Sequence, residues 1–178
     1  MKLQLAAIAL LVMSGAQSGR PPVPQRRTLR ESLVGTWRLV AARQRLSDGS
    51  VRPDPEPGAR GVGYIMYDAT GHVCVVLANP DRPKWKSPKS PTDAEIRSGF
   101  EGVVAYCGTY ETNEKQQYVI HHVEADKNPQ VMGTDRIRRA TVSGDRLVLR
   151  PVDLPAGVSD WTVEWVRVDS PQTSSAHP

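Results

Sequence analysis

His121 and His122 stand beside Glu124 in the strongest catalytic or metal-binding pattern of the chain, His121-His122-Val123-Glu124. Adjacent residues on a β-strand point to opposite faces, so the two histidines cannot bind one metal ion from a regular strand. His122 and Glu124 share a face, but a site needs a further ligand, and nothing in the sequence places His72 within reach. We therefore predict no metal site and no cofactor.

His121 could also serve as a general acid or base. With Tyr106 or Tyr110 donating a hydrogen bond to a substrate carbonyl, it would suit isomerisation, cyclisation or hydration of a hydrophobic metabolite. The competing interpretation is that these side chains satisfy one another inside a filled core. The sequence has no nucleophile elbow, phosphate-binding loop or cofactor fingerprint. Catalysis by His121 and Tyr106 is therefore an alternative, not our leading prediction.

These residues lie in a pattern of short strands separated by turns. Periodicity and turn residues predict an all-β fold of eight antiparallel strands, which suits a small closed barrel holding one ligand. The capping box Thr92-Asp93-Ala94-Glu95 predicts one short helix between strands three and four, covering an end or flank of the barrel. The eight strands are expected near residues 34–44, 61–68, 71–78, 102–112, 117–124, 134–142, 146–151 and 160–168.

Hairpin geometry assigns the two faces of the strands. A loop of two or four residues after Asp68 would pair Tyr64 with Val75 and Met66 with Val73, and the apolar face that results is taken as interior. In the same way, a loop at 113–116 would pair Gly108 with His121. The predicted ligand-binding residues are Tyr64, Met66, Tyr106, Tyr110, His121, Arg136 and Arg138.

The two arginines reach this set through a third hairpin. A two-residue turn at Gly144-Asp145 places Arg136 and Arg138 on the apolar face of their strand. A ligand carboxylate is the natural partner of such guanidinium groups. The alternative is that both arginines lie at the barrel rim, in surface ion pairs with Glu124 or Asp135.

The ends of the barrel carry a recognisable pair of motifs. Gly35-Thr36-Trp37 opens the first strand, and Trp165-Val166-Arg167 closes the last. Trp37 would plug one barrel end, with the Arg167 guanidinium stacked on its face, and Gly35 would permit their close approach. With Asn79-Pro80-Asp81-Arg82-Pro83 and Tyr106-Cys107-Gly108-Thr109-Tyr110-Glu111, residues 33–168 resemble the bacterial lipocalin-like domain family. The resemblance implies a calycin-type barrel without fixing a ligand or a reaction.

Cys74 and Cys107 fall on faces assigned as exterior, on strands three and four. A disulfide between them is one interpretation, since export would permit it. Two small buried cysteines beneath the helix are the other.

The first 16 residues are predicted to be a signal peptide. Lys2 precedes an apolar run over 5–13, and small residues lead to a cut ahead of Gln17. The run is too short to span a bilayer, so we expect no transmembrane segment. We expect an exported protein, periplasmic or secreted. It would have a Pro/Arg-rich linker over 17–32, one barrel domain over 33–169 and a disordered tail over 170–178.

The formal charge of +4 comes from the N-terminal arm. Residues 20–45 carry seven arginines and one glutamate, whereas residues 46–178 carry fifteen basic and eighteen acidic groups. An arm without interleaved aromatic residues is typical of a solvated linker, so we predict no nucleic-acid partner.

The sequence therefore predicts an exported lipocalin-like barrel that binds a small hydrophobic or amphipathic molecule in its interior. The first alternative is the cofactor-free enzyme with His121 and Tyr106. The second is a barrel filled by its own side chains, with a structural or interaction role for the loop that carries Trp85.

Overall fold

The structure, a computed structural model, describes residues 27–168. The predicted signal peptide, most of the predicted linker and the predicted tail lie outside this range. No helix within it is long and apolar enough to cross a membrane. The elements, in chain order, are α1 (Leu29–Leu33), β1 (Gly35–Leu46), β2 (Val51–Pro53), β3 (Val62–Tyr67), β4 (His72–Ala78), α2 (Asp93–Glu101), β5 (Val103–Asn113), β6 (Tyr118–Asp126), the 3-10 turn η1 (Pro129–Val131), β7 (Asp135–Ser143), β8 (Arg146–Pro151) and β9 (Val158–Arg167).

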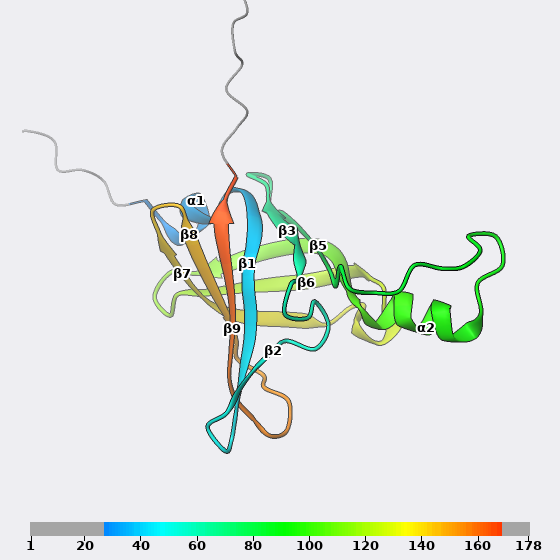
Figure 1. Ribbon diagram of the computed structural model, residues 1–178. Helices are drawn as coiled ribbons and strands as arrows, with labels where there is room; N and C mark the ends of the chain where they lie inside the picture. Colours follow the sequence, from blue (N-terminus) through cyan, green and yellow to red (C-terminus); the bar gives the residue numbers. More distant parts are fainter. Residues whose placement is uncertain (1–26, 169–178) are drawn as a thin grey trace, which may run out of the picture.

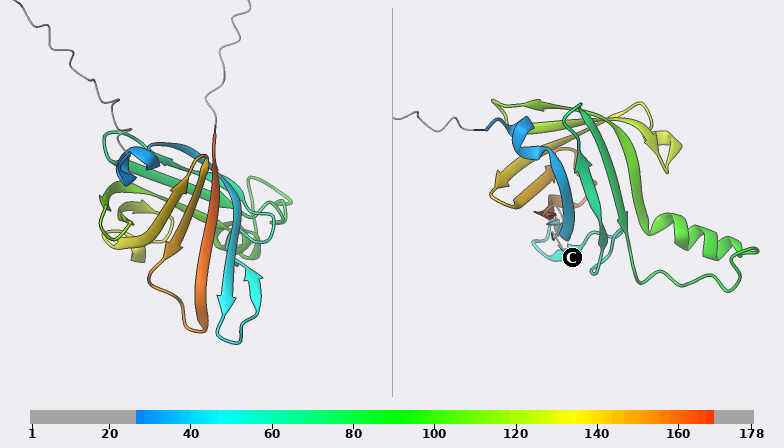
Figure 2. Two further views of the ribbon diagram at one scale, coloured as in Figure 1. Left: turned by 90° about the vertical axis from the view of Figure 1, so that its left-hand side faces the viewer. Right: turned by 90° about the horizontal axis from the view of Figure 1, so that it is seen from above.

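Eight antiparallel strands close into a barrel (Figures 1 and 2). From β3 to β9, strands that are consecutive in the chain pair with each other. Strand β1 closes the ring by pairing with β3 on one side and with β9 on the other. The short β2 is an addition to the predicted set and pairs only with the far part of β1. The predicted all-β barrel is therefore correct.

Helix α1 closes one end of the barrel. Thr28 and Glu31 form a capping box at its start, and the Glu114 carboxylate accepts hydrogen bonds from the Leu29 and Arg30 amides. Leu29 and Leu33 are buried in the core, so the packed domain begins earlier than the linker predicted over 17–32 would suggest.

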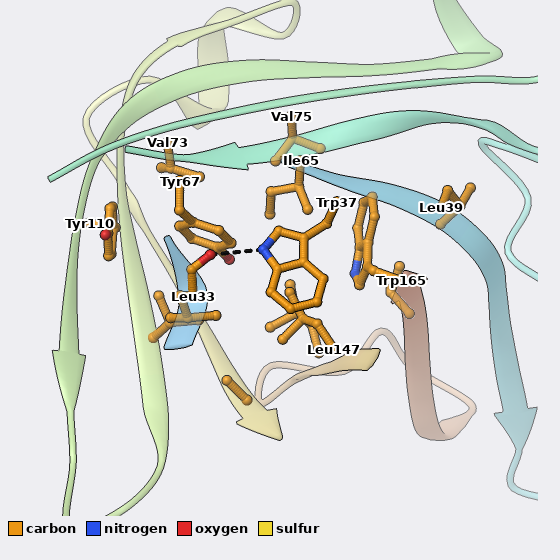
Figure 3. Close-up of a cluster of buried hydrophobic side chains, with 14 of the residues drawn as sticks. Leu33, Trp37, Leu39, Ile65, Tyr67, Val73, Val75, Tyr110, Leu147 and Trp165 are labelled. Atoms are coloured by element: carbon orange, nitrogen blue, oxygen red, sulfur yellow. Dashed lines mark hydrogen bonds between the residues drawn. The ribbon is translucent and has the colours of Figure 1, made fainter. Parts of the chain in front are cut away.

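Trp37, which lies among the buried side chains of Figure 3, seals the same end together with Arg167. The Trp37 indole is fully buried and donates to the Leu33 carbonyl at 2.8 Å. The Arg167 guanidinium lies 4.0 Å from the centre of the Trp37 ring and donates to the Ser32 and Val34 carbonyls. Gly35 has a φ of 135°, and a Cβ there would lie 2.6 Å from Arg167 Nη1. A larger residue would disturb this contact.

The faces predicted for β3 are wrong. Asp68 N donates to the His72 carbonyl, and the Asp68 carboxylate accepts from the Gly71 and His72 amides, which makes a three-residue loop. An odd loop length shifts the pairing by one residue and exchanges the faces. Tyr64 and Met66 therefore lie on the outer surface, each 47% exposed, and cannot line the interior. Ile65 and Tyr67 point inward instead.

The faces predicted for β5 and β6 are correct, although the pairing differs by two residues. Tyr110 lies opposite His121, and Gly108 lies opposite Val123 next to a β-bulge. A slip of two residues keeps each side chain on its own face. Tyr106, Tyr110 and His121 all point into the barrel, where they are buried.

Helix α2 lies between β4 and β5, the third and fourth barrel strands, but it does not cover the barrel. It projects away from the barrel wall, and it contains no buried residue (Figure 2). Trp85 donates its indole N–H to the Glu95 carbonyl and lies against Gly99, so the helix packs against its own loop. Cys74 and Cys107 lie opposite each other on β4 and β5 and form a disulfide.

Candidate functional site

A buried histidine between two tyrosines occupies the barrel interior. The Tyr67 hydroxyl lies 2.8 Å from His121 Nε2, and the Tyr106 hydroxyl lies 2.8 Å from His121 Nδ1. His121 is fully buried, so both of its ring nitrogens are used within the protein. It cannot contact a ligand without losing one of these bonds. Sequence analysis missed Tyr67 because the incorrect face assignment for β3 placed it outside.

Burial keeps the three side chains of this cluster uncharged. It lowers the pKa of His121 well below 6.5, and the nearby Arg138 and Arg136 charges act in the same direction. Burial also raises the pKa of Tyr67 well above 10 and that of Tyr106 above its ordinary value. The cluster is therefore a network of neutral hydrogen bonds at neutral pH.

Tyr110 is interior but serves another purpose. Its hydroxyl donates to the Asp68 carbonyl at 2.9 Å, and its ring meets Tyr67 edge-on at 4.9 Å. The Arg30 guanidinium from α1 lies 5.1 Å above the ring. Tyr110 therefore belongs to the end closed by α1 and does not line a ligand cavity.

A cavity of about 60 Å³ lies toward the opposite end of the barrel. Tyr106 lines it, whereas His121 lies behind Tyr106. Most of the lining is apolar, and these apolar side chains come mainly from β3, β4, β5, β8 and β9. They include Ile65, Val75, Leu77, Leu149 and Val163. The volume exceeds the roughly 10–15 Å³ that one water molecule needs, and it is far below the roughly 300–1,000 Å³ of a pocket for a drug-sized ligand.

Arg136 lines this cavity with its charge already compensated. Its guanidinium lies 2.9 Å from the Asp126 carboxylate, whose side chain is only 3% exposed. It also lies 4.5 Å above the Tyr106 ring. Arg136 therefore pairs with neither Glu124 nor Asp135, the two surface partners considered from the sequence. Asp135 instead lies 2.7 Å from His122 on the neighbouring strand.

Arg138 lines the cavity without a carboxylate partner among residues 27–168. It is half-buried, its guanidinium hydrogen-bonds to the Tyr106 hydroxyl oxygen, and it also donates to the Ile137 carbonyl at 3.3 Å. This is a long bond, so most of the donors of the guanidinium remain available.

Two tryptophans of β9 provide further donors. The indole nitrogens of Trp161 and Trp165 are buried. The Trp161 N–H is directed at the Asp54 carboxyl group, whereas the Trp165 N–H has no hydrogen-bond partner within residues 27–168. Both side chains line the cavity. Sequence analysis used Trp165 only as a closing motif and did not identify Trp161. The alternation Trp161-Val163-Trp165 was the available signal, since residues two and four apart share one face of a strand.

Asp54 is another lining residue that was not predicted from the sequence. It follows β2, is 5% exposed and accepts a hydrogen bond from the Glu56 amide at 3.1 Å. Burial raises the pKa of its carboxyl group. The predicted set therefore divides: Tyr106, Arg136 and Arg138 meet at the cavity, whereas Tyr64, Met66, Tyr110 and His121 do not line it.

The family profile described as a lipocalin-like domain matches residues 34–168, most of the chain and all eight barrel strands. The chain belongs to the lipocalin-like domain family. A comparison with curated proteins finds no match. Lipocalin-like barrels are in general ligand-binding folds, and in this lipocalin-like domain the interior space lies beside Tyr106 and Arg138. No group of three or more His, Cys, Asp or Glu side chains within residues 27–168 is placed to hold a metal ion.

Proposed function

We propose that the protein is exported and that its lipocalin-like domain binds one small amphipathic molecule in the cavity beside Tyr106 and Arg138. The observation that carries the proposal is the buried indole N–H of Trp165, a residue that lines the cavity and whose indole N–H has no acceptor among residues 27–168. Buried donors are nearly always hydrogen-bonded, so a bound molecule with an acceptor would complete the site.

The size of the cavity limits the ligand. A volume of about 60 Å³ cannot hold a retinoid or a long fatty acid without displacing core side chains. The rest of the interior is filled, with Trp37, Tyr67, Ile65 and Leu147 all less than 2% exposed. A close-packed core resists such displacement. The proposed ligand therefore has a short apolar part and one polar group.

The Cys74–Cys107 disulfide supports export. Disulfides persist in oxidising compartments such as the periplasm and the extracellular space. The predicted signal peptide over residues 1–16 is consistent with the same route.

The test uses two valines that are adjacent in sequence and face opposite ways. Val75 lines the cavity and is 3% exposed, whereas Val76 is 52% exposed on the outer face. Val75→Phe should fill the cavity, and Val76→Phe should leave it unchanged. Thermal unfolding of both variants checks that they fold.

Native mass spectrometry and tryptophan fluorescence then measure binding of alcohols, amides and carboxylates of two to six carbons. The proposal expects binding by wild type and by Val76→Phe, and loss of binding in folded Val75→Phe. Absence of binding by every probe, with no co-purified molecule, would refute it, as would equal binding by both variants.

A further inference from the structure

The ionisable groups around the cavity include one cation, Arg138, without a carboxylate partner among residues 27–168. Arg136 is paired with Asp126, and Glu56 lies 2.9 Å from Lys127, whose side chain is 16% exposed. Of the ionisable lining residues, these pairs leave Arg138 and Asp54. Burial raises the pKa of the Asp54 carboxyl group, whereas hydrogen bonds from the Glu56 amide and from Trp161 lower it. Arg138 is therefore the lining cation that a bound anion would pair with.

The hydrogen-bonding groups at the cavity are mostly donors. Arg138 offers guanidinium N–H groups, and Trp165 offers one buried indole N–H, whereas the Trp161 N–H is directed at the Asp54 carboxyl group. Trp165 is only 3% exposed, so water outside the barrel does not satisfy it. A ligand that fits these donors must present several acceptors on one small group. A carboxylate does so with two oxygens and about four lone pairs.

The Tyr67–His121–Tyr106 network adds a further donor. A neutral imidazole donates from one ring nitrogen and accepts at the other. Tyr67 is fully buried and has no other hydrogen-bond partner among residues 27–168, so its O–H must donate to His121 Nε2. His121 then carries its proton on Nδ1 and donates it to the Tyr106 oxygen. The Tyr106 O–H is left to donate into the cavity that Tyr106 lines.

We infer that the ligand is a small monocarboxylate of about three to six carbons, whose carboxylate accepts hydrogen bonds from Arg138, Trp165 and Tyr106. Its short hydrocarbon part packs against Ile65 and Val75. His121 is a positioning residue, because it holds Tyr106 in the donating orientation without touching the ligand. This inference rests on the proposed function and specifies the ligand class of the same site.

The test compares butyrate with butyramide, a neutral molecule of nearly the same shape, by isothermal titration calorimetry. Hydrogen bonds to an ionised group are about twice as strong as neutral ones, so butyrate should bind to wild type about tenfold more tightly. Arg138→Met should remove this preference and keep the binding of butyramide. Arg139→Met is the matched control, since Arg139 is exposed beside Tyr118, and it should keep the preference. Trp165→Phe should weaken both probes, because it removes an N–H donor that either can use.

Equal or tighter binding of butyramide to wild type would overturn the carboxylate inference and leave the proposed function standing. Binding of neither probe, nor of any other molecule tested above, would instead refute the proposed function itself. Octanoate should bind more weakly than butyrate, and the reverse order would overturn the size assignment.

The proton position gives a separate readout. Nitrogen-15 NMR of the His121 side chain should show a protonated Nδ1 and an unprotonated Nε2 in the butyrate complex. A protonated Nε2 would overturn the role given to the Tyr106 hydroxyl.

Discussion

Replacing Arg167 with methionine should lower the free energy of unfolding by about 3–4 kcal/mol. The guanidinium donates to the Ser32 carbonyl at 2.7 Å and the Val34 carbonyl at 2.8 Å. Hydrogen bonds from a charged group contribute about 1.5–3 kcal/mol each, and the low value applies because the side chain is 25% exposed. The cation–π contact with Trp37 adds about 1 kcal/mol, part of which methionine replaces by packing on the same ring.

Urea denaturation followed by circular dichroism measures this loss. The variant should remain folded in water, because domains of this size are stable by about 5–15 kcal/mol. Arg43→Met is the control: Arg43 lies on β1 and pairs with Glu164 on β9, but its side chain is 56% exposed, so the loss should stay below about 1 kcal/mol. Equal losses in the two variants would refute the role assigned to Arg167 at the closed end.

Three further predictions concern the interior and the disulfide. Gly108→Ala should prevent folding or lower the free energy of unfolding by more than about 3 kcal/mol, because the added Cβ would collide with the His122 carbonyl oxygen. A soluble variant with an unchanged thermal midpoint would contradict this. Replacing Cys74 and Cys107 together by alanine should cost about 3–4 kcal/mol in urea denaturation, since they close a loop of 33 residues, and a loss below 1 kcal/mol would be inconsistent with that loop entropy. The His121 NMR signals should keep their neutral shifts below pH 6.5, where the unfolded chain takes up a proton that the folded protein does not. His121 should therefore reduce stability as the pH falls through 6.5, and protonation of the folded protein at pH 6.5 would disprove the effect of burial.

The β7–β8 hairpin was fully predictable from the sequence. Gly144-Asp145 is a two-residue turn, and Val142 pairs with Leu147 and Ala140 with Leu149 as expected. Two-residue turns leave little freedom in the pairing, so turn chemistry alone decides which face each side chain takes. The positions of Arg136 and Arg138 at the cavity followed from this one turn.

The β3–β4 hairpin shows where sequence patterns become ambiguous. Val62, Tyr64 and Met66 alternate with Ile65 and Tyr67, so both faces of β3 are apolar. Only the loop length decides between them. The three-residue loop depends on hydrogen bonds that the Gly71 and His72 amides donate to the Asp68 carboxylate, and the sequence does not specify these bonds. Because of this ambiguity, the predicted site contained Tyr64 and Met66, which face outward, and lacked Tyr67, which faces inward.

The cavity lining was only partly predictable for a different reason. Asp54 follows a strand of three residues, too short for its periodicity to be detected. The partner of Arg136 was missed because Asp126 lies beyond the predicted end of its strand, and its burial depends on the tertiary structure. Sequence analysis therefore identifies the face a residue occupies more readily than the charges it meets there.

The closed end formed by α1 also fixes where the chain enters and leaves the barrel. Arg27 and Val168, the first and last described residues, lie at that end, whereas β2 and the β8–β9 turn lie at the other (Figure 1). The Val168 amide donates to the carbonyl of Thr36, three residues after the end of α1, which places both ends beside the same short segment. A fusion partner or surface attachment at either end would therefore leave the cavity end facing away. For the same reason, joining residues 27 and 168 by a short linker and opening the β8–β9 turn should give a circular permutant with the same barrel.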